Sequence, residues 1–405
     1  MNAKEIVKEY GQEQLLRFED RLSAEEKAKL YAQIESLDFS VLDELKKKAG
    51  DLHKGEITPL KAMELSEIKA RHDELEKAGL DAIKAGKVGA VLLAGGMGTR
   101  LGSDNPKGMY NIGITRELFI FECLINNLMD VVKKSGTYIH LFVMTSDLNY
   151  ESTTNFFKEK KNFGYPDEYI TFFKQEMAPA CDHDGKVFLE EPGKVAVSPN
   201  GNGGWFLSMM KTGVLKKVKD AGIEWLNLFA VDNVCQRICD PVFIGATLLE
   251  GRTIGAKVVR KNDPDERVGV MCLEDGRPSI VEYYEQTEQL RNTLDERGER
   301  VYNFGVILNY LFNVAEQEEI ANTSLPYHVV EKKIPYIDEK GNTVKPEAPN
   351  GFKFEQLVLD MIHLGKSCLP FEVVREYEFA PVKNKEGVDS VESARELLKK
   401  NGVVL

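Results

Sequence analysis

The chain has 405 residues, 42% of them apolar, and a formal net charge of −12. This length suits roughly two to three lobes of about 150 residues each, with enough apolar material to bury a core, which excludes a disordered protein. The acidic balance argues against sequence-independent binding to nucleic acid, which needs a basic face, but it leaves room for a local basic pocket.

The sequence carries no sign of export or membrane insertion. Residues 1–15 are charged and lack the continuous apolar stretch of a signal peptide. No segment approaches the roughly 20 apolar residues that span a bilayer. The six cysteines are scattered without a C-x-x-C pair, so they predict reduced structural thiols rather than a zinc site. We expect a cytoplasmic protein with no membrane partner and no nucleic-acid partner.

Residues 1–85 predict a helical N-terminal region. Residues 23–26 read Ser-Ala-Glu-Glu, a capping-box pattern, and apolar residues recur at helical spacing from Ile34 to Leu45. Asp38 and Ser40 interrupt that spacing, which favours two or more short helices. These helices are expected to pack onto the main domain, and binding of a partner is the alternative.

From Val88 the pattern changes to apolar runs that alternate with helical stretches. The expected elements, in chain order, are a strand at 88–94, a helix at 118–134, a strand at 139–144, a helix at 204–219 and a strand at 225–231. This alternation is typical of an α/β fold with a mainly parallel sheet and helices on its faces. In such sheets, ligands bind beyond the carboxyl ends of the strands. We therefore predict a main α/β domain at 86–330 and a short C-terminal region at 331–405.

A β-hairpin is also expected in the main domain. Residues 271–273 and 280–283 are strand-like and flank a short turn, with Asp275-Gly276 at its tip. Such a hairpin could cover the open side of the ligand crevice.

The strongest motif follows the first predicted strand. Residues 92–102 read LLAGGMGTRLG, and residues 106–108 read PKG. Glycines after a buried strand let the backbone approach a ligand and turn its N–H groups toward phosphate oxygens. The planar fork of Arg100 and the point charge of Lys107 then suit a triphosphate whose outer part leaves as pyrophosphate.

This loop differs from two common nucleotide-binding signatures. Leu101 stands where the dinucleotide fingerprint requires its third glycine, and the Gly-Lys-Ser/Thr ending of a P-loop is missing. A nicotinamide-dependent oxidoreductase would also need a ribose-binding acid about 20 residues further on. Glu117 and Glu122 lie in that range, but Glu122 falls within the predicted helix and Glu117 directly precedes it, so this class of enzyme is disfavoured.

Three other candidates lie further along the chain. Asp232 follows the strand at 225–231, inside the predicted crevice, where a carboxylate suits Mg²⁺ together with phosphate oxygens and water. Residues 200–204 read NGNGG, which predicts either a flexible turn or a wall for a base or sugar. Lys383, near the C-terminus, is by itself an ordinary surface charge.

Taken in order, these motifs resemble the UDP-sugar pyrophosphorylases, and most of all the eukaryotic UDP-N-acetylglucosamine pyrophosphorylases. The matching blocks cover almost the whole chain and lie at 11–18, 93–113, 172–189, 201–204, 222–245, 255–259, 281–283, 332–336 and 378–384. The resemblance implies a Rossmann-like nucleotidyltransferase fold whose catalytic domain is 86–330, and Mg²⁺ as the cofactor. It also implies a reaction in which UTP and a sugar 1-phosphate form a UDP-sugar and pyrophosphate.

The same resemblance implies a role for each matching residue. The nucleotide-binding positions, which would line the uracil and ribose or hold the base, are Leu93, Gly95, Gly96, Gln175 and Gly201. Arg100 and Lys107 would meet the triphosphate. Asp232 would bind the magnesium ion, and Lys383 would hold the sugar phosphate.

The sugar-binding positions are the part of the resemblance with departures. The matching residues are Asn202, Gly269, Glu282 and Tyr283. Val306 stands where the family has an asparagine that contacts the sugar, and Leu357 and Leu359 replace two phenylalanines near the acetyl pocket. N-acetylglucosamine 1-phosphate is the expected substrate. Glucose 1-phosphate, galactose 1-phosphate and a non-catalytic UDP-sugar-binding protein are the alternatives.

Overall fold

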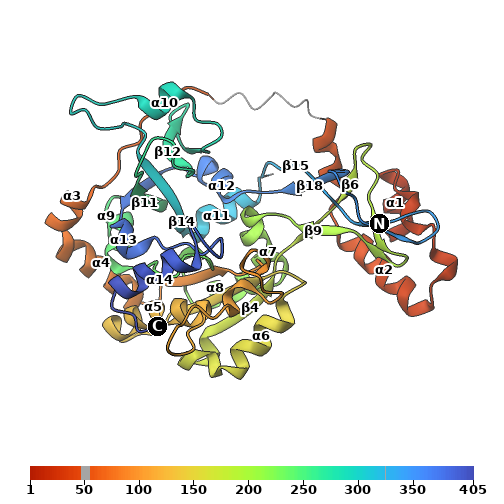
Figure 1. Ribbon diagram of the computed structural model, residues 1–405, viewed down its shortest axis with the longest axis horizontal. Coiled ribbons are helices and arrows are strands. Elements are labelled where there is room, and N and C mark those ends of the chain that lie inside the picture. Colours follow the sequence, from red (N-terminus) through yellow and green to blue (C-terminus); the bar gives the residue numbers. More distant parts are fainter. Residues whose placement is uncertain (47–54, 324) are drawn as a thin grey trace. The chain divides into compact units, whose positions relative to one another are not determined.

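The computed structural model describes residues 1–46, 55–323 and 325–405 as two compact units (Figure 1). Unit 1 consists of Met1–His53, Gln175–Gly204 and Leu325–Asp360. Unit 2 consists of Lys54–Lys174, Trp205–Ser324 and Met361–Leu405. Each unit therefore combines segments that are far apart in the sequence, whereas the regions expected from the sequence were continuous stretches.

A mixed sheet forms the centre of unit 2. Its strands among the described residues are β1 (Ile57–Thr58), β2 (Val88–Leu93), β3 (His140–Thr145), β4 (Ile170–Lys174), β10 (Trp225–Ala230), β11 (Ile254–Arg260), β12 (Val270–Glu274), β13 (Arg277–Val281), β14 (Phe304–Asn313) and β19 (Cys368–Glu372). Strands β10, β2, β3 and β4 are neighbours in that order and run parallel. Strand β14 is antiparallel to β10 and β11. The predicted α/β fold with a mainly parallel core is confirmed.

Both faces of this parallel core are buried, which explains the continuous apolar runs. All six residues of β2 are buried. Ala90 and Leu92 point into a core shared with helices of unit 2, whereas Gly89 lies on the opposite face against Leu226 and Phe142. A strand covered on both sides has no solvent-facing positions, so polar residues do not alternate along it.

The helices of unit 2 cover the sheet and follow the predicted alternation. They are α3 (Leu65–Ala70), α4 (His72–Lys84), α5 (Ile120–Ser135), α6 (Tyr150–Glu159), α7 (Trp205–Lys211), α8 (Val214–Asp220), α9 (Pro241–Leu249), α10 (Glu288–Asn292), α11 (Val314–Ala321), α13 (Arg375–Glu378) and α14 (Val391–Lys400). Helix α5 ends at Gly136 in the left-handed conformation, as its sequence predicts. The single helix expected at 204–219 is instead two helices, because Gly213 takes a φ of 76° between α7 and α8. The hairpin of β12 and β13 is confirmed, with Asp275 and Gly276 both at positive φ in its turn.

Unit 1 contains the N-terminal helices and several short strands. Its elements are α1 (Ala3–Glu9), α2 (Ala24–Ser36), β5 (Met177–Pro179), β6 (Cys181–Asp182), β7 (Leu189–Glu191), β8 (Lys194–Val195), β9 (Val197–Pro199), β15 (His328–Lys332), β16 (Tyr336–Ile337), β17 (Thr343–Val344) and β18 (Gly351–Glu355), and α12 (Val358–Leu364) begins in this unit. The capping box predicted at Ser23 is present, and its partner is Glu26. Leu30 and Ile34 of α2 share a core with Val187 and Phe354. The short helices are therefore packed, and their partners are strands of the same unit.

Two further expectations concern the whole chain. All six cysteines are buried and free of disulfide bonds, as predicted for structural thiols. Among the described residues, each helix is too short or too polar to serve as a transmembrane segment.

Candidate active site

The glycine-rich loop after β2 closes on itself and places Lys107 beside its glycines. The backbone N–H of Lys107 donates to the carbonyl of Gly96 at 3.0 Å, and the N–H of Gly98 donates to the carbonyl of Asn105 at 2.8 Å. A Cβ on Gly96 would meet no atom within 4 Å, so this residue faces open space. The loop therefore holds Lys107 at the edge of an open, glycine-lined surface.

Gly108 fixes this loop against helix α5. A Cβ at Gly108 would lie 2.2 Å from the ring of Phe121, which is far below a van der Waals contact. Phe121 is fully buried in α5. The Lys-Gly pair thus combines the cation predicted to meet the triphosphate with a residue that has to be small.

Three segments that are distant in the sequence meet at the carboxyl ends of β2 and β10. The N–H of Val231 donates to the carbonyl of Leu93 at 3.2 Å, which joins the two strand ends. The N–H of Val382 donates to the carbonyl of Asp232 at 2.8 Å, and Asn233 forms an isolated antiparallel bridge with Pro381. The C-terminal segment that carries Lys383 is therefore hydrogen-bonded to Asp232, two residues after the end of β10.

The charged side chains of these segments interact with one another. Burial lowers the pKa of Lys107 below its ordinary value, and the positive charges of Arg100 and Lys383 lower it further. The carboxylate of Asp232 acts in the opposite direction. Arg100, Asp232 and Lys383 therefore lie near enough to Lys107 in unit 2 for their charges to act on it. Their individual roles stay predictions.

Lys383 has a partner that the sequence does not reveal. Its Nζ lies 3.0 Å from Oδ2 of Asp389, and its backbone N–H donates to the carbonyl of Asp389 at 2.7 Å. Asp389 has a φ of 53° and precedes the N-cap of α14. A single aspartate in a polar loop has no pattern that marks it as a partner of Lys383.

The base-binding candidates of unit 1 lie together within that unit. Nε2 of Gln175 donates to the carbonyl of Gly201 at 2.6 Å. The N–H of Gly203 donates to the carbonyl of Gln356 at 2.8 Å, and Oδ1 of Asn202 accepts from the N–H of Val358 at 3.0 Å. Residues 200–204 therefore form a turn that is packed against the chain rather than a loose one.

The sugar-binding candidates of unit 2 form another group. The carbonyl of Gly269 accepts from the N–H of Val306 at 2.9 Å. A Cβ on Gly269 would lie 3.3 Å from Oε1 of Glu282, so these two residues are close. Tyr283 is exposed, and its ring meets that of Tyr284 edge-on at 5.2 Å between centroids. Val306, where the sequence departs from the family, therefore lies beside the predicted sugar contacts.

The departures at Leu357 and Leu359 fall in unit 1. Both side chains are half-buried. A Cβ on Gly203 would lie 2.6 Å from the carbonyl carbon of Leu357, so the backbone of Leu357 packs directly against the turn at 200–204. Leu357, which stands where the family has the first of the two phenylalanines, therefore neighbours the predicted sugar contact Asn202.

The residues around Asp232 fit a magnesium ion that arrives with its substrate. Among the described residues, no group of three or more His, Cys, Asp or Glu side chains could hold a metal by itself. Mg²⁺ commonly binds through one or two carboxylates, substrate phosphates and water. A single half-buried carboxylate beside a glycine-lined loop suits that mode and does not suit a metal held by the protein alone.

The structure is an α/β protein whose predicted ligand edge lies at the carboxyl ends of the parallel strands. Residues 37–404 match the family model of UTP–glucose-1-phosphate uridylyltransferase. The chain is 37% identical to UDP-N-acetylhexosamine pyrophosphorylase-like protein 1 of Mus musculus, over 94% of this chain and 79% of that protein. It is 34% identical to UDP-N-acetylglucosamine pyrophosphorylase of Saccharomyces cerevisiae, over 97% and 88%.

A solved structure agrees with these matches. The uridine diphosphate N-acetylglucosamine pyrophosphorylase of Trypanosoma brucei has a TM-score of 0.80 and 28% identity, and the match covers 97% of this chain and 83% of that one. The chain belongs to the UDP-sugar pyrophosphorylase family, the family of UTP–glucose-1-phosphate uridylyltransferase.

Proposed function

We propose that this protein is a uridylyltransferase that joins UTP and a sugar 1-phosphate into a UDP-sugar and pyrophosphate. The observation that supports this proposal is that the charges of Arg100, Lys383 and Asp232 all act on Lys107, which the glycine-rich loop holds beside Gly96. Two phosphorylated substrates repel each other, so the reaction needs a concentration of positive charge at one place. Membership in the family supports the same reaction.

N-acetylglucosamine 1-phosphate is the substrate we propose first. Relatives named for UDP-N-acetylhexosamine and UDP-N-acetylglucosamine share 37% and 34% identity with this chain over nearly its whole length. Val306, Leu357 and Leu359 are the positions at which the sugar pocket would differ from theirs. Glucose 1-phosphate and galactose 1-phosphate are the next candidates.

The proposed chemistry is an in-line displacement at the α-phosphorus of UTP. A phosphate oxygen of the sugar 1-phosphate forms the new P–O bond, and the bond to the β-phosphate breaks, so that pyrophosphate leaves. The nucleophile is already an anion near neutral pH, so no general base is needed. Positioning and charge stabilisation must then supply most of the rate, as in other phosphoryl transfers.

The residues of unit 2 divide this work. The glycine-rich loop presents backbone to the triphosphate, and Arg100 and Lys107 neutralise the charge that develops on the leaving pyrophosphate. Lys383, held in place by Asp389, orients the sugar phosphate. Asp232 would hold Mg²⁺, which supplies further charge neutralisation for the phosphate oxygens.

A binding protein without catalysis is the second candidate, because one relative carries the name pyrophosphorylase-like. The two candidates differ in their response to substrates. The test is pyrophosphate release from UTP with a panel of four sugar 1-phosphates: N-acetylglucosamine, N-acetylgalactosamine, glucose and galactose. The proposal expects release with at least one sugar and no release with ATP. Tight binding of UDP-sugar without any release would support the binding protein instead.

A further inference from the structure

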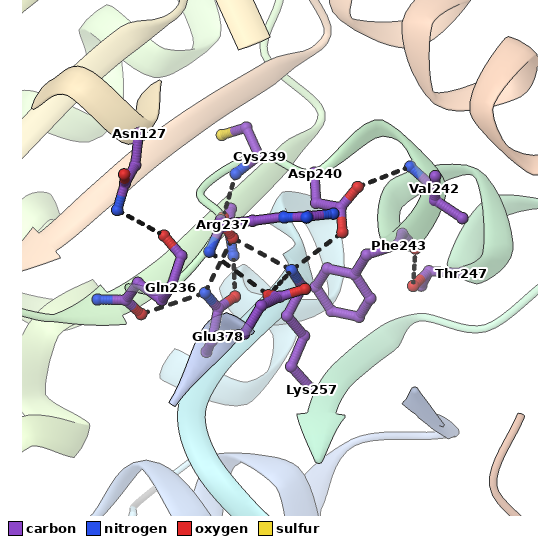
Figure 2. Close-up of polar contacts among 12 residues, drawn as sticks. Asn127, Gln236, Arg237, Cys239, Asp240, Val242, Phe243, Thr247, Lys257 and Glu378 are labelled. Carbon is purple, nitrogen blue, oxygen red and sulfur yellow. Dashed lines mark hydrogen bonds and ion pairs between the residues drawn. The ribbon is translucent and has the colours of Figure 1, made fainter. Parts of the chain in front are cut away.

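A fully buried lysine on the central sheet of unit 2 has no role in the chemistry above. Lys257 is on β11, and its side chain is 0% exposed. Figure 2 shows its ammonium group at the centre of a polar cluster. Nζ lies 3.0 Å from Oδ2 of Asp240, 2.5 Å from Oε2 of Glu378 and 3.2 Å from the carbonyl oxygen of Arg237. It also lies 5.5 Å from the ring centroid of Phe243.

Lys257 keeps its charge in spite of its burial. Burial disfavours the ammonium form of Lys257, but Asp240 and Glu378 together outweigh burial and raise its pKa. Burial also acts against ionisation of Asp240, yet Lys257 holds the pKa of that carboxyl below its ordinary value. Burial and the negative charge of Asp240 raise the pKa of Glu378. An isolated buried charge is costly, so Lys257 is sustained only by its partners.

The partners of Lys257 belong to the two segments that carry proposed active-site residues. Asp240 and Arg237 end the segment that begins at Asp232. Glu378 begins the segment that leads to Lys383. We call Lys257, Asp240 and Glu378 the buried clamp, because the lysine joins the far ends of both segments.

Further hydrogen bonds join the same two segments nearer the site. Nδ2 of Asn233 donates to the carbonyl of Glu378 at 2.7 Å, and Oδ1 of Asn233 accepts from the N–H of Ala380 at 2.9 Å. The N–H of Val382 donates to the carbonyl of Asp232 at 2.8 Å. Hydrogen bonds thus join the two segments at Asp232 and Asn233, and the buried clamp joins them again at Asp240 and Glu378.

We propose that Lys257 is a positioning residue that sets the place of Lys383 relative to Asp232. The inference rests on the proposed function, because Lys383 matters only if a sugar phosphate binds there. Loss of the clamp would let residues 378–384 move while the glycine-rich loop, which has its own hydrogen bonds to Gly96 and Gly98, stays in place. A purely structural lysine would instead weaken all properties of the protein alike.

The test compares Lys257→Met with the wild type in three measurements. Steady-state kinetics give kcat/KM for the sugar phosphate, titration gives the affinity for UTP, and hydrogen exchange reports on peptides that cover 378–384 and 88–93. We expect kcat/KM to fall about 10- to 100-fold, by analogy with the loss on mutation of residues that orient metal ligands. We expect UTP affinity to stay unchanged, and exchange to rise at 378–384 only.

A Lys383→Ala background separates positioning from general damage. If Lys257 acts through Lys383, adding Lys257→Met to Lys383→Ala should change kcat/KM by no more than about twofold, because the two effects are not additive. Val218→Ala is the matched control, since Val218 is buried on α8 and belongs to neither segment. It should lower stability and leave the exchange at 378–384 unchanged.

The single variant Lys257→Met could unfold the protein, because it leaves the carboxyl groups of Asp240 and Glu378 in the core without a cation. The triple variant Lys257→Met, Asp240→Asn, Glu378→Gln removes all three charges and serves in that case. Equal losses of kcat/KM in both backgrounds, or unchanged exchange at 378–384, would overturn the proposal. If the wild type forms no UDP-sugar at all, the proposed function fails, and the exchange measurement still decides whether Lys257 holds this segment.

Discussion

The backbone N–H of Val382 donates to the backbone carbonyl of Asp232 at 2.8 Å, across a separation of 150 residues. This bond ties the segment that carries the next residue, Lys383, to the loop that follows the carboxyl end of β10. A lysine that reads as an ordinary surface charge in the sequence is thereby attached to the segment that carries Asp232, where we propose a site for phosphates.

Lys107 should contribute strongly to the rate of turnover and should not stabilise the folded protein. We expect Lys107→Ala to lower kcat by about 100- to 1,000-fold, as is typical when one charge-stabilising group is removed. Its pKa is lowered in the folded protein by burial and by Arg100 and Lys383, so its charge opposes folding at neutral pH. Lys107→Met, which keeps most of the aliphatic stem, should therefore not lower the thermal midpoint. Near-normal turnover of Lys107→Ala would reject this role.

Lys383 should act mainly on the sugar phosphate. We expect Lys383→Ala to raise the KM for the sugar 1-phosphate with a smaller change in the KM for UTP. Asp389→Asn should shift the same KM in the same direction but less, because it loosens the 3.0 Å ion pair without removing the lysine. Lys385→Ala is the control, since this exposed lysine lies two residues away. An unaltered KM for the sugar phosphate in Lys383→Ala would refute the assignment.

Alanine should lower the stability of the fold at Gly108 and the affinity for UTP at Gly96. Gly108→Ala would drive a Cβ into the ring of Phe121, so we expect a loss of about 1–3 kcal/mol of unfolding free energy. Gly96→Ala meets open space and should leave the unfolding free energy unchanged, but its methyl group should weaken UTP binding. Denaturant unfolding and UTP titration of both variants measure the contrast. A stable Gly108→Ala, or a Gly96→Ala with normal affinity for UTP, would contradict the packing described here.

Asp232 should set the requirement for magnesium. We expect EDTA to abolish turnover and added Mg²⁺ to restore it. Asp232→Asn should need more Mg²⁺ for half-maximal turnover, because an amide oxygen binds this cation less strongly than a carboxylate. Titration of turnover against Mg²⁺ at saturating UTP is the measurement. The same half-maximal concentration in both proteins would exclude Asp232 as a ligand.

The sequence predicts the parallel core because strands that are buried on both faces are continuous apolar runs. Val88–Leu93 reads as one apolar run because no position of that strand meets water. The glycine-rich loop can also be predicted from the sequence, because its glycines and the two cations lie within one short stretch. Such features need only neighbours in the chain.

Contacts between distant residues leave no comparable pattern. Lys257 lies 17 residues from Asp240 and 121 residues from Glu378, so the residues next to it in the sequence do not predict the buried clamp. The division into two units was also not predictable, because strands after Gln175 and after Leu325 join the N-terminal helices. The helix expected at 204–219 is two helices because a single glycine, Gly213, adopts a left-handed conformation that a helical pattern does not encode.

The most direct test of the central claim is to follow both products of one reaction. The protein is mixed with UTP, Mg²⁺ and N-acetylglucosamine 1-phosphate, and nucleotides and pyrophosphate are measured over time for the wild type and Lys107→Ala. We predict that the wild type forms one UDP-sugar and one pyrophosphate for each UTP consumed, and that the variant forms almost none. Consumption of UTP without a UDP-sugar, or equal rates in both proteins, would contradict the account.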